Sequence, residues 1–157
     1  MASITTPATR ALDKAGIAYA LHEYTYESGH HIGEQAAAAI GADPARVFKT
    51  LMLEIDGKPG CAVIPVAQSL KLKKAAAALG AKSAQMMDPM KAERLTGFHV
   101  GGISPFGQKR RVPTVFDETV RAHPRAILNA GRRGLMAELA PGDAIALLSA
   151  TLADLTS

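Results

Sequence analysis

Residues 49–66 read KTLMLEIDGKPGCAVIPV, which is the pattern of a β-hairpin. Two largely apolar runs, Lys49 to Ile55 and Cys61 to Val66, flank the segment Asp56-Gly57-Lys58-Pro59-Gly60. Glycine and proline mark turns, and the flanking runs have the length of ordinary strands. The hairpin also places a lysine, Lys49, at one end of a strand. A cation held on a rigid strand can be aimed at a ligand better than one on a loose loop.

Start and stop signals for helices lie on both sides of this hairpin. Thr6-Pro7 supplies an N-cap followed by proline at the first helical position, and Gly16 can end that helix. The same signals predict further helices over Gly33 to Ile40, from Asp43-Pro44 toward Phe48, over Leu70 to Leu79, from Asp88-Pro89 to Gly97, and from Pro141 onward. Further strands are expected at Ile17 to His22, Phe98 to Gly101, Val112 to Phe116, Ala126 to Ala130 and Leu135 to Leu139.

This order of helices and strands predicts the fold class. The elements do not repeat as regular strand-helix-strand units, so we do not expect a doubly wound nucleotide-binding fold. We expect an α+β fold with a mixed, mainly antiparallel sheet and surrounding helices, in one domain that spans residues 1–157. The apolar runs are far shorter than the roughly 20 residues of a membrane-spanning helix, and the first residues lack the pattern of a leader peptide. We therefore expect a cytoplasmic protein with no membrane partner.

Several common site types are not indicated. Cys61 is the only cysteine, which excludes a disulfide within the chain and a zinc site built on paired cysteines. His30 and His31 are neighbours that point in different directions on any regular element, and no third ligand follows at metal spacing. The sequence has no glycine-rich phosphate loop, and Ser104 is not in a GxSxG elbow. We expect no metal, no cofactor and no serine or cysteine nucleophile.

The charge is modestly basic, with a formal net charge of +4. Basic residues gather in clusters at Lys71, Lys73 and Lys74, at Lys109, Arg110 and Arg111, and at Arg132 and Arg133. Taken alone, such clusters are more often solvated surface than binding sites. If they contact nucleic-acid phosphates, binding should weaken as the salt concentration rises.

A second informative stretch is VGGISPFGQ, residues 100–108. Adjacent glycines allow backbone N–H groups to approach a ligand closely. Together with a mobile cation such as Lys49, these groups can stabilise negative charge on a carbonyl or phosphate oxygen. The pair of segments therefore predicts a site for a polar carbonyl substrate.

These segments resemble the YbaK/ProX family of aminoacyl-tRNA deacylases, and the YbaK branch in particular. The match runs in order from about Thr6 to about Asp154. It is carried by Val47 to Leu51, Leu79 to Lys82, Met87 to Met90, Thr96-Gly97, Val100 to Gln108, Pro113 and Arg133 to Leu135. The resemblance implies a single domain similar to the editing domain of some bacterial prolyl-tRNA synthetases. It also implies a sheet that curls toward a partly closed barrel.

The resemblance implies a trans-editing hydrolase that cleaves the ester of misacylated tRNA, with Cys-tRNA(Pro) as the first substrate. The implied partners are the acceptor end of tRNA(Pro) and prolyl-tRNA synthetase. In this scheme Lys49 contacts the carbonyl or the terminal ribose and phosphate, and backbone N–H groups at Gly101 and Gly102 hold the oxyanion. Ser104 and Pro105 are expected to bind substrate. Water or the substrate's own thiol supplies the attack.

Further pocket residues leave the substrate open. Tyr24 matches a pocket tyrosine of the YbaK branch, but Asn129 replaces a serine and Met136 replaces an aspartate. Losing that carboxylate removes a charge that could hold the substrate amino group or tune the lysine. Alanine, serine, threonine or 2-aminobutyrate are therefore alternatives to cysteine, and Met136 could instead face the core. A noncatalytic module that binds tRNA or a synthetase, and a regulator that binds a free amino acid or nucleotide, also stay open.

Overall fold

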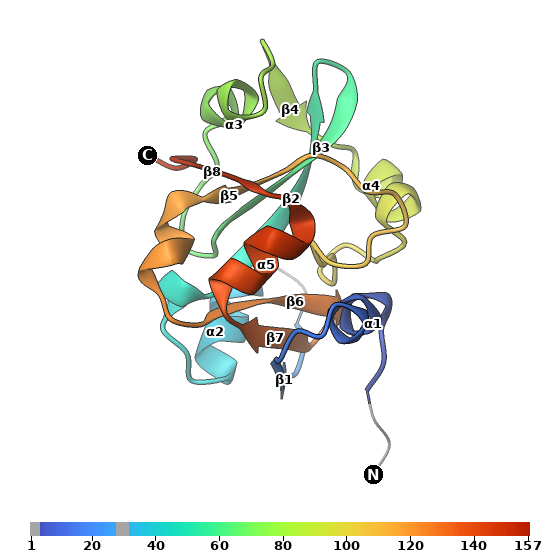
Figure 1. Ribbon diagram of the computed structural model, residues 1–157, viewed down its shortest axis with the longest axis vertical. Helices are drawn as coiled ribbons and strands as arrows, with labels where there is room; N and C mark the ends of the chain where they lie inside the picture. Colours follow the sequence, from blue (N-terminus) through green and yellow to red (C-terminus); the bar gives the residue numbers. More distant parts are fainter. Residues whose placement is uncertain (1–3, 28–31) are drawn as a thin grey trace.

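The computed structural model describes residues 4–27 and 32–157, which form two β-sheets with helices around them (Figure 1). The helices are α1 Pro7–Lys14, α2 Ile32–Ala39, α3 Leu72–Ala78, α4 Pro89–Thr96 and α5 Pro141–Leu148, with short 3-10 helices η1 Pro44–Arg46 and η2 Glu118–Ala122. The strands are β1 Ala20–Glu23, β2 Phe48–Ile55, β3 Lys58–Pro65, β4 Ala84–Met86, β5 Thr114–Asp117, β6 Ala126–Arg132, β7 Leu135–Leu139 and β8 Thr151–Ala153. In the part of the chain that the structure describes, no helix could span a bilayer. The His30-His31 pair lies outside the described residues.

The larger sheet has the strand order β4-β2-β3-β5-β8. Its centre is the predicted hairpin, in which β2 and β3 pair antiparallel from Phe48 opposite Pro65 to Ile55 opposite Lys58. Strand β5 runs parallel to β3 and to β8, so the sheet is mixed. Strand β4 pairs with β2 only from Leu53 to Ile55. The first half of β2, which carries Lys49, therefore has no strand of this sheet on that side.

The smaller sheet has the order β1-β7-β6 and is antiparallel throughout. Strands β6 and β7 form the second predicted hairpin, with an irregular register between Asn129 and Arg132. A single parallel bridge between Val47 and Ile127 joins this sheet to the larger one, just before Lys49. The α+β class with mixed, mainly antiparallel strands is confirmed. The strands form two open sheets, however, in place of the one sheet curling toward a barrel that we expected.

Helix α1 begins where its sequence signal predicts. The Thr6 hydroxyl accepts the backbone N–H of Thr9, and the Thr9 hydroxyl accepts the backbone N–H of Thr6, which is a capping box. The Thr6 hydroxyl also donates to the Ala130 carbonyl and so ties the helix to β6. Ala8 and Leu12 then bury the inner face of α1.

The core consists of one large and two smaller apolar clusters. The large cluster includes the fully buried rings of Phe106 and Phe116. One smaller cluster contains Ala37, Val47, Val66, Ile127 and Met136, with the ring of Tyr24 packed against it. Ile127 and Met136 belong to the smaller sheet, Ala37 to α2, and Val47 and Val66 flank β2 and β3 of the larger sheet, so this cluster fills the junction where the bridge lies.

Most element predictions are confirmed to within a few residues, and the exceptions have local causes. The segment predicted as a strand over Phe98 to Gly101 is a turn, so that prediction is wrong. Gly97 takes the left-handed conformation at the end of α4, and the N–H of Gly102 turns back to donate to the His99 carbonyl at 2.8 Å. The short strands β4 and β8 were not predicted.

Candidate functional site

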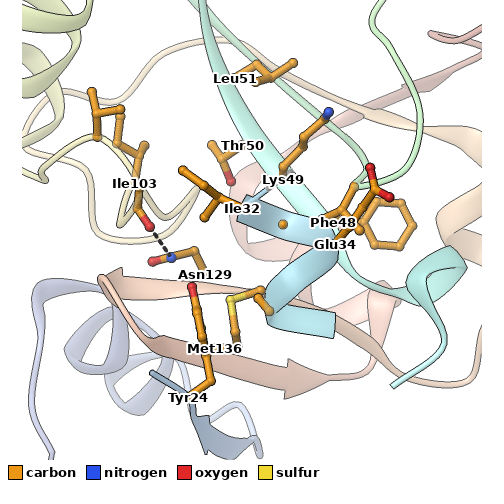
Figure 2. Close-up of a pocket in the computed structure, with 15 residues that line it drawn as sticks. Tyr24, Ile32, Glu34, Phe48, Lys49, Thr50, Leu51, Ile103, Asn129 and Met136 are labelled. Carbon is orange, nitrogen blue, oxygen red and sulfur yellow. Dashed lines mark hydrogen bonds between the residues drawn. The ribbon is translucent and has the colours of Figure 1, made fainter. Parts of the chain in front are cut away.

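A pocket of about 470 Å³ lies where the two sheets meet (Figure 2). Its walls are α2, the first half of β2, the loop at residues 100–103 and the β6–β7 hairpin. Such a volume is ordinary for a small-molecule site. The lining residues are Tyr24, Ile32, Gly33, Glu34, Ala36, Phe48, Lys49, Thr50, Leu51, Val66, Val100, Gly101, Ile103, Asn129 and Met136. The structure thus brings together Tyr24, Lys49, Gly101, Asn129 and Met136, which the sequence predicted as site residues.

Lys49 supplies the cation of this pocket. It is the second residue of β2 and is partly buried. Burial lowers the pKa of its ammonium group, while the nearby carboxylate of Glu34 acts in the opposite direction. Figure 2 shows Glu34 of α2 near Lys49. A partly desolvated ammonium group attracts a negatively charged oxygen more strongly than one in bulk water.

Gly101 shapes the loop opposite Lys49. Its φ of +92° is a conformation that favours glycine, and a Cβ atom there would lie 2.6 Å from the Tyr26 hydroxyl. The Tyr26 ring also stacks under the Arg133 guanidinium, 5.1 Å from its centroid. Glycine at position 101 therefore lets the loop pack closely on Tyr26 while it lines the pocket.

Asn129 fixes this loop to the smaller sheet. Its Nδ2 donates to the Gly101 carbonyl at 3.3 Å, and its Oδ1 accepts the Gly131 N–H at 2.7 Å. On the other side, Arg133 Nε donates to the Val100 carbonyl at 2.8 Å. The loop is therefore held by side chains from two positions of the β6–β7 hairpin.

Three other predicted site residues, Gly102, Ser104 and Pro105, are not among the residues that line this pocket. The Gly102 N–H is already donated to the His99 carbonyl. Ser104 is fully buried, and its hydroxyl accepts the Phe106 N–H at 3.1 Å. Pro105 lines a separate hollow, together with Gly107 and Gln108. Gly102 and Ser104 shape the loop, because the backbone N–H of Gly102 and the hydroxyl of Ser104 each form a hydrogen bond within it.

Met136 both lines the pocket and faces the core, which are the two placements that the sequence left open. It is only 3% exposed and packs in the apolar cluster with Val47 and Ile127 where the two sheets meet, yet it also lines the pocket. It lies directly opposite Asn129 across the β6–β7 hairpin. Tyr24 packs beside it, and burial raises the pKa of the Tyr24 hydroxyl, which therefore stays protonated at neutral pH. This part of the pocket thus has an apolar floor with a neutral hydroxyl beside it.

Sequence reasoning missed Glu34 and Thr50. Glu34 reaches the pocket from α2, a helix whose packing against β2 depends on long-range contacts. Thr50 carried a signal, because it follows Lys49 within the motif itself. Cys61, which the sequence set aside, is fully buried in β3, and burial raises the pKa of its thiol to about 12. Among the described residues no group of three His, Cys, Asp or Glu side chains is arranged to hold a metal ion.

The basic clusters differ in their relation to the pocket. Lys74 of α3 is paired with Asp154 at 2.6 Å and donates to the Thr156 carbonyl, so it fastens the C-terminal segment. Arg111 donates to the Leu147 carbonyl near the end of α5. Arg133, by contrast, holds Val100 at the pocket wall. Arg132 and Arg133 are therefore the cluster that adjoins the candidate site.

Comparisons with known proteins agree with this geometry. Residues 27–147 match the aminoacyl-tRNA editing domain. The chain is 35% identical over 154 residues to EbsC of Enterococcus faecalis, named as a candidate Cys-tRNA(Pro)/Cys-tRNA(Cys) deacylase, covering 97% of this chain and 93% of that protein. It is 26% identical over 117 residues to YwhH of Bacillus subtilis, covering 74% of each.

Solved structures show the same fold. The crystal structure of a candidate trans-editing enzyme for prolyl-tRNA synthetase superposes with a TM-score of 0.84 at 25% identity, covering 99% of both chains. The hypothetical protein APE2540 superposes with a TM-score of 0.85 at 20% identity. The family match and the EbsC match confirm the resemblance seen in the sequence. The chain belongs to the aminoacyl-tRNA editing domain family.

Proposed function

We propose that residues 1–157 act as one trans-editing domain that hydrolyses the ester of a misacylated tRNA, with Cys-tRNA(Pro) as the first substrate. Membership of the editing family assigns aminoacyl-tRNA deacylation as the class of reaction. The observation that carries the proposal is the pocket itself, in which Lys49 and the Gly101 loop face one cavity. The names of EbsC and of the trans-editing structure support the choice of Cys-tRNA(Pro).

The chemistry requires orientation and charge stabilisation more than a protein nucleophile, because an aminoacyl ester is already activated. Lys49 holds the carbonyl or the terminal ribose and phosphate, and the backbone of Gly101 lies beside the developing oxyanion. Cys61 and Ser104 are fully buried and do not line the pocket, which argues against either as the attacking group. Water attacks, or the thiol of a cysteinyl group attacks its own carbonyl. In the second case a C–S bond forms, the ester C–O bond breaks, and the thiol proton passes to the departing ribose oxygen.

The second candidate is deacylation of another small aminoacyl group. Met136, Val66, Phe48 and Ala36 give the pocket an apolar lining that suits a small side chain such as that of alanine or 2-aminobutyrate. Serine and threonine would leave a hydroxyl to be satisfied in that lining, which costs free energy. Met136 is therefore the residue to change if cysteine is not preferred.

The proposed partners are the acceptor end of tRNA(Pro) and prolyl-tRNA synthetase. Arg132 and Arg133 adjoin the pocket wall, where they can contact phosphates of the acceptor end. Contacts of this kind give affinity without sequence information. Charge reversal of Arg132, which pairs with Glu23 at 3.6 Å on the surface, should weaken tRNA binding and flatten its salt dependence.

The test is hydrolysis of tRNA(Pro) charged with cysteine, alanine, serine, threonine or 2-aminobutyrate, by the parent protein and by Lys49→Ala. Removing one electrostatic stabiliser typically slows the chemical step by about 10²–10³-fold. Lys74→Ala is the matched control, because Lys74 is a surface lysine paired with Asp154 and does not line the pocket. Turnover that survives in Lys49→Ala would refute the role of this lysine. Binding of tRNA without hydrolysis of any ester would favour a noncatalytic module.

A further inference from the structure

Thr50 has an unusual hydroxyl. Among the described residues, its Oγ1 is the one buried side-chain oxygen or nitrogen that has no hydrogen-bond partner. Buried polar groups in folded proteins are nearly always hydrogen-bonded, and an exception needs an explanation. Thr50 also lines the candidate site. The residue that carries the one unsatisfied buried hydroxyl among the described side chains therefore also lines the candidate site.

The position of Thr50 in β2 explains why no neighbouring strand satisfies it. Thr50 pairs with Val63 of β3, whose side chain offers no hydrogen-bonding group. On the other side β4 begins to pair only at Leu53, so no strand of this sheet lies next to Thr50 there. Successive side chains in a strand point to opposite faces. Lys49 and Thr50 therefore present a cation and a neutral hydroxyl in different directions along one pocket wall.

Other neutral oxygens lie on the Thr50 side of the pocket. In the view of Figure 2, the Thr50 hydroxyl points toward the side where Asn129 and Tyr24 lie, whereas Lys49 extends away from it. The Tyr24 hydroxyl is kept protonated by burial, and the Gly101 carbonyl, which accepts from Asn129 Nδ2, has a second lone pair. An ammonium group has three N–H donors and no acceptor. These oxygens therefore match an ammonium group better than they match a carboxylate or phosphate.

The proposed substrate carries such a group on the amino acid. The aminoacyl group is the small end of a misacylated tRNA, so it must occupy the buried part of the pocket, while the nucleotide stays at the open part. Thr50 Oγ1, Asn129 at 8% exposure and Met136 at 3% exposure belong to that buried part. The terminal ribose then lies near Lys49, whose side chain extends away from the Thr50 hydroxyl in Figure 2.

We propose that the Thr50 hydroxyl accepts a hydrogen bond from the α-amino group of the aminoacyl ester and so positions it in the pocket. This inference rests on the proposed deacylase function. Met136 replaces an aspartate whose carboxylate could hold the substrate amino group. The inference assigns part of this amine binding to the neutral hydroxyl of Thr50. Thr50 is a positioning residue, whose contribution depends on the substrate amine.

The test compares Thr50→Val with Thr50→Ser. Valine keeps the β-branched shape and removes the hydroxyl, whereas serine keeps the hydroxyl. The probes are cysteinyl-adenosine linked through a non-hydrolysable amide at the 3′ position and its analogue without the α-amino group, with Kd measured by calorimetry. A hydrogen bond to a charged group predicts that Thr50→Val weakens binding of the amino probe by about tenfold or more. Binding of the probe without the amine should stay unchanged, and Thr50→Ser should bind both probes as the parent does.

Thr114→Val is the matched control. Thr114 is a buried strand threonine outside this pocket, and its hydroxyl donates to the Val112 carbonyl at 3.1 Å. Thr114→Val should therefore lower the urea midpoint and leave binding unchanged, while Thr50→Val should keep or raise the midpoint, because it removes an unsatisfied group. Equal losses for both probes, or unchanged binding of the amino probe in Thr50→Val, would overturn the inference and leave the deacylase standing. A parent protein that binds the amino probe but cleaves no aminoacyl-tRNA would overturn the proposed function instead.

Discussion

Replacing Asn129 with alanine should destabilise the protein and slow deacylation together. The substitution removes the acceptor of the Gly131 N–H, at 2.7 Å, and the donor to the Gly101 carbonyl, at 3.3 Å. A hydrogen bond contributes about 0.5–1.5 kcal/mol net to the free energy of unfolding, and leaving a buried donor without an acceptor costs more. We take the lower value for the longer bond and the upper value for the shorter one, which gives a loss of about 2 kcal/mol. For a chain of this size that lowers Tm by about 4–8 °C.

The assay is urea denaturation of the parent, Asn129→Ala and Asn129→Asp, with deacylation of Cys-tRNA(Pro) measured on the same samples. Aspartate keeps the acceptor for Gly131 but places negative charge against the Gly101 carbonyl. Asn129→Asp should therefore lose less stability than Asn129→Ala. Neither variant can donate to the Gly101 carbonyl, so both should release the loop at residues 100–103 and lose the same share of activity. A change in unfolding free energy within about 0.5 kcal/mol for Asn129→Ala, the range of an ordinary surface substitution, would refute this account of the loop.

Further predictions concern the cation, the loop glycine and the thiol. Because burial lowers the pKa of Lys49, the folded state binds fewer protons than the unfolded chain between the two pKa values, and stability rises with pH there. Lys49→Met should remove this rise, measured by urea denaturation from neutral to alkaline pH, and should be at least as stable as the parent at neutral pH. Gly101→Ala should cost about 1–3 kcal/mol from its positive φ and slow deacylation by displacing Tyr26. Gly16→Ala, with a φ of +71° and no atom within 4 Å, should cost stability alone. Cys61, with a pKa of about 12, should react with a thiol reagent only on unfolding, so rapid labelling of the native protein would contradict its burial.

Local signals in the sequence predicted the elements that depend on local chemistry. The turn at Asp56-Gly57 and the cap at Thr6 act within a few residues, and both appear where expected. The strand expected at Phe98 to Gly101 was wrong because the left-handed Gly97 and the backbone of Gly102 turn the chain there. Apolar character at Phe98 reflects burial in the core, which a turn can also provide.

The arrangement of the sheets and part of the site could not be predicted, because they depend on contacts distant in sequence. The three-residue strand β4 has mostly exposed side chains and forms only because Leu53 to Ile55 offer a free edge. Glu34 reaches the pocket through the packing of α2, for which its own segment carries no signal. The family motif located Lys49 and Gly101, yet Ser104 in the same motif faces the core.

The pocket is walled by short segments that lie far apart along the chain, from Tyr24 to Met136. Each wall belongs to a different helix, strand or loop, and the walls meet only at the junction of the two sheets. Catalytic activity should therefore require the complete fold, and a fragment that lacks any one wall should be inactive. Because the walls are separate segments, substrate specificity can change through one wall while the other walls stay the same. Residues of α2 that line the pocket, such as Ile32 and Glu34, can change during evolution without altering the strand that carries Lys49.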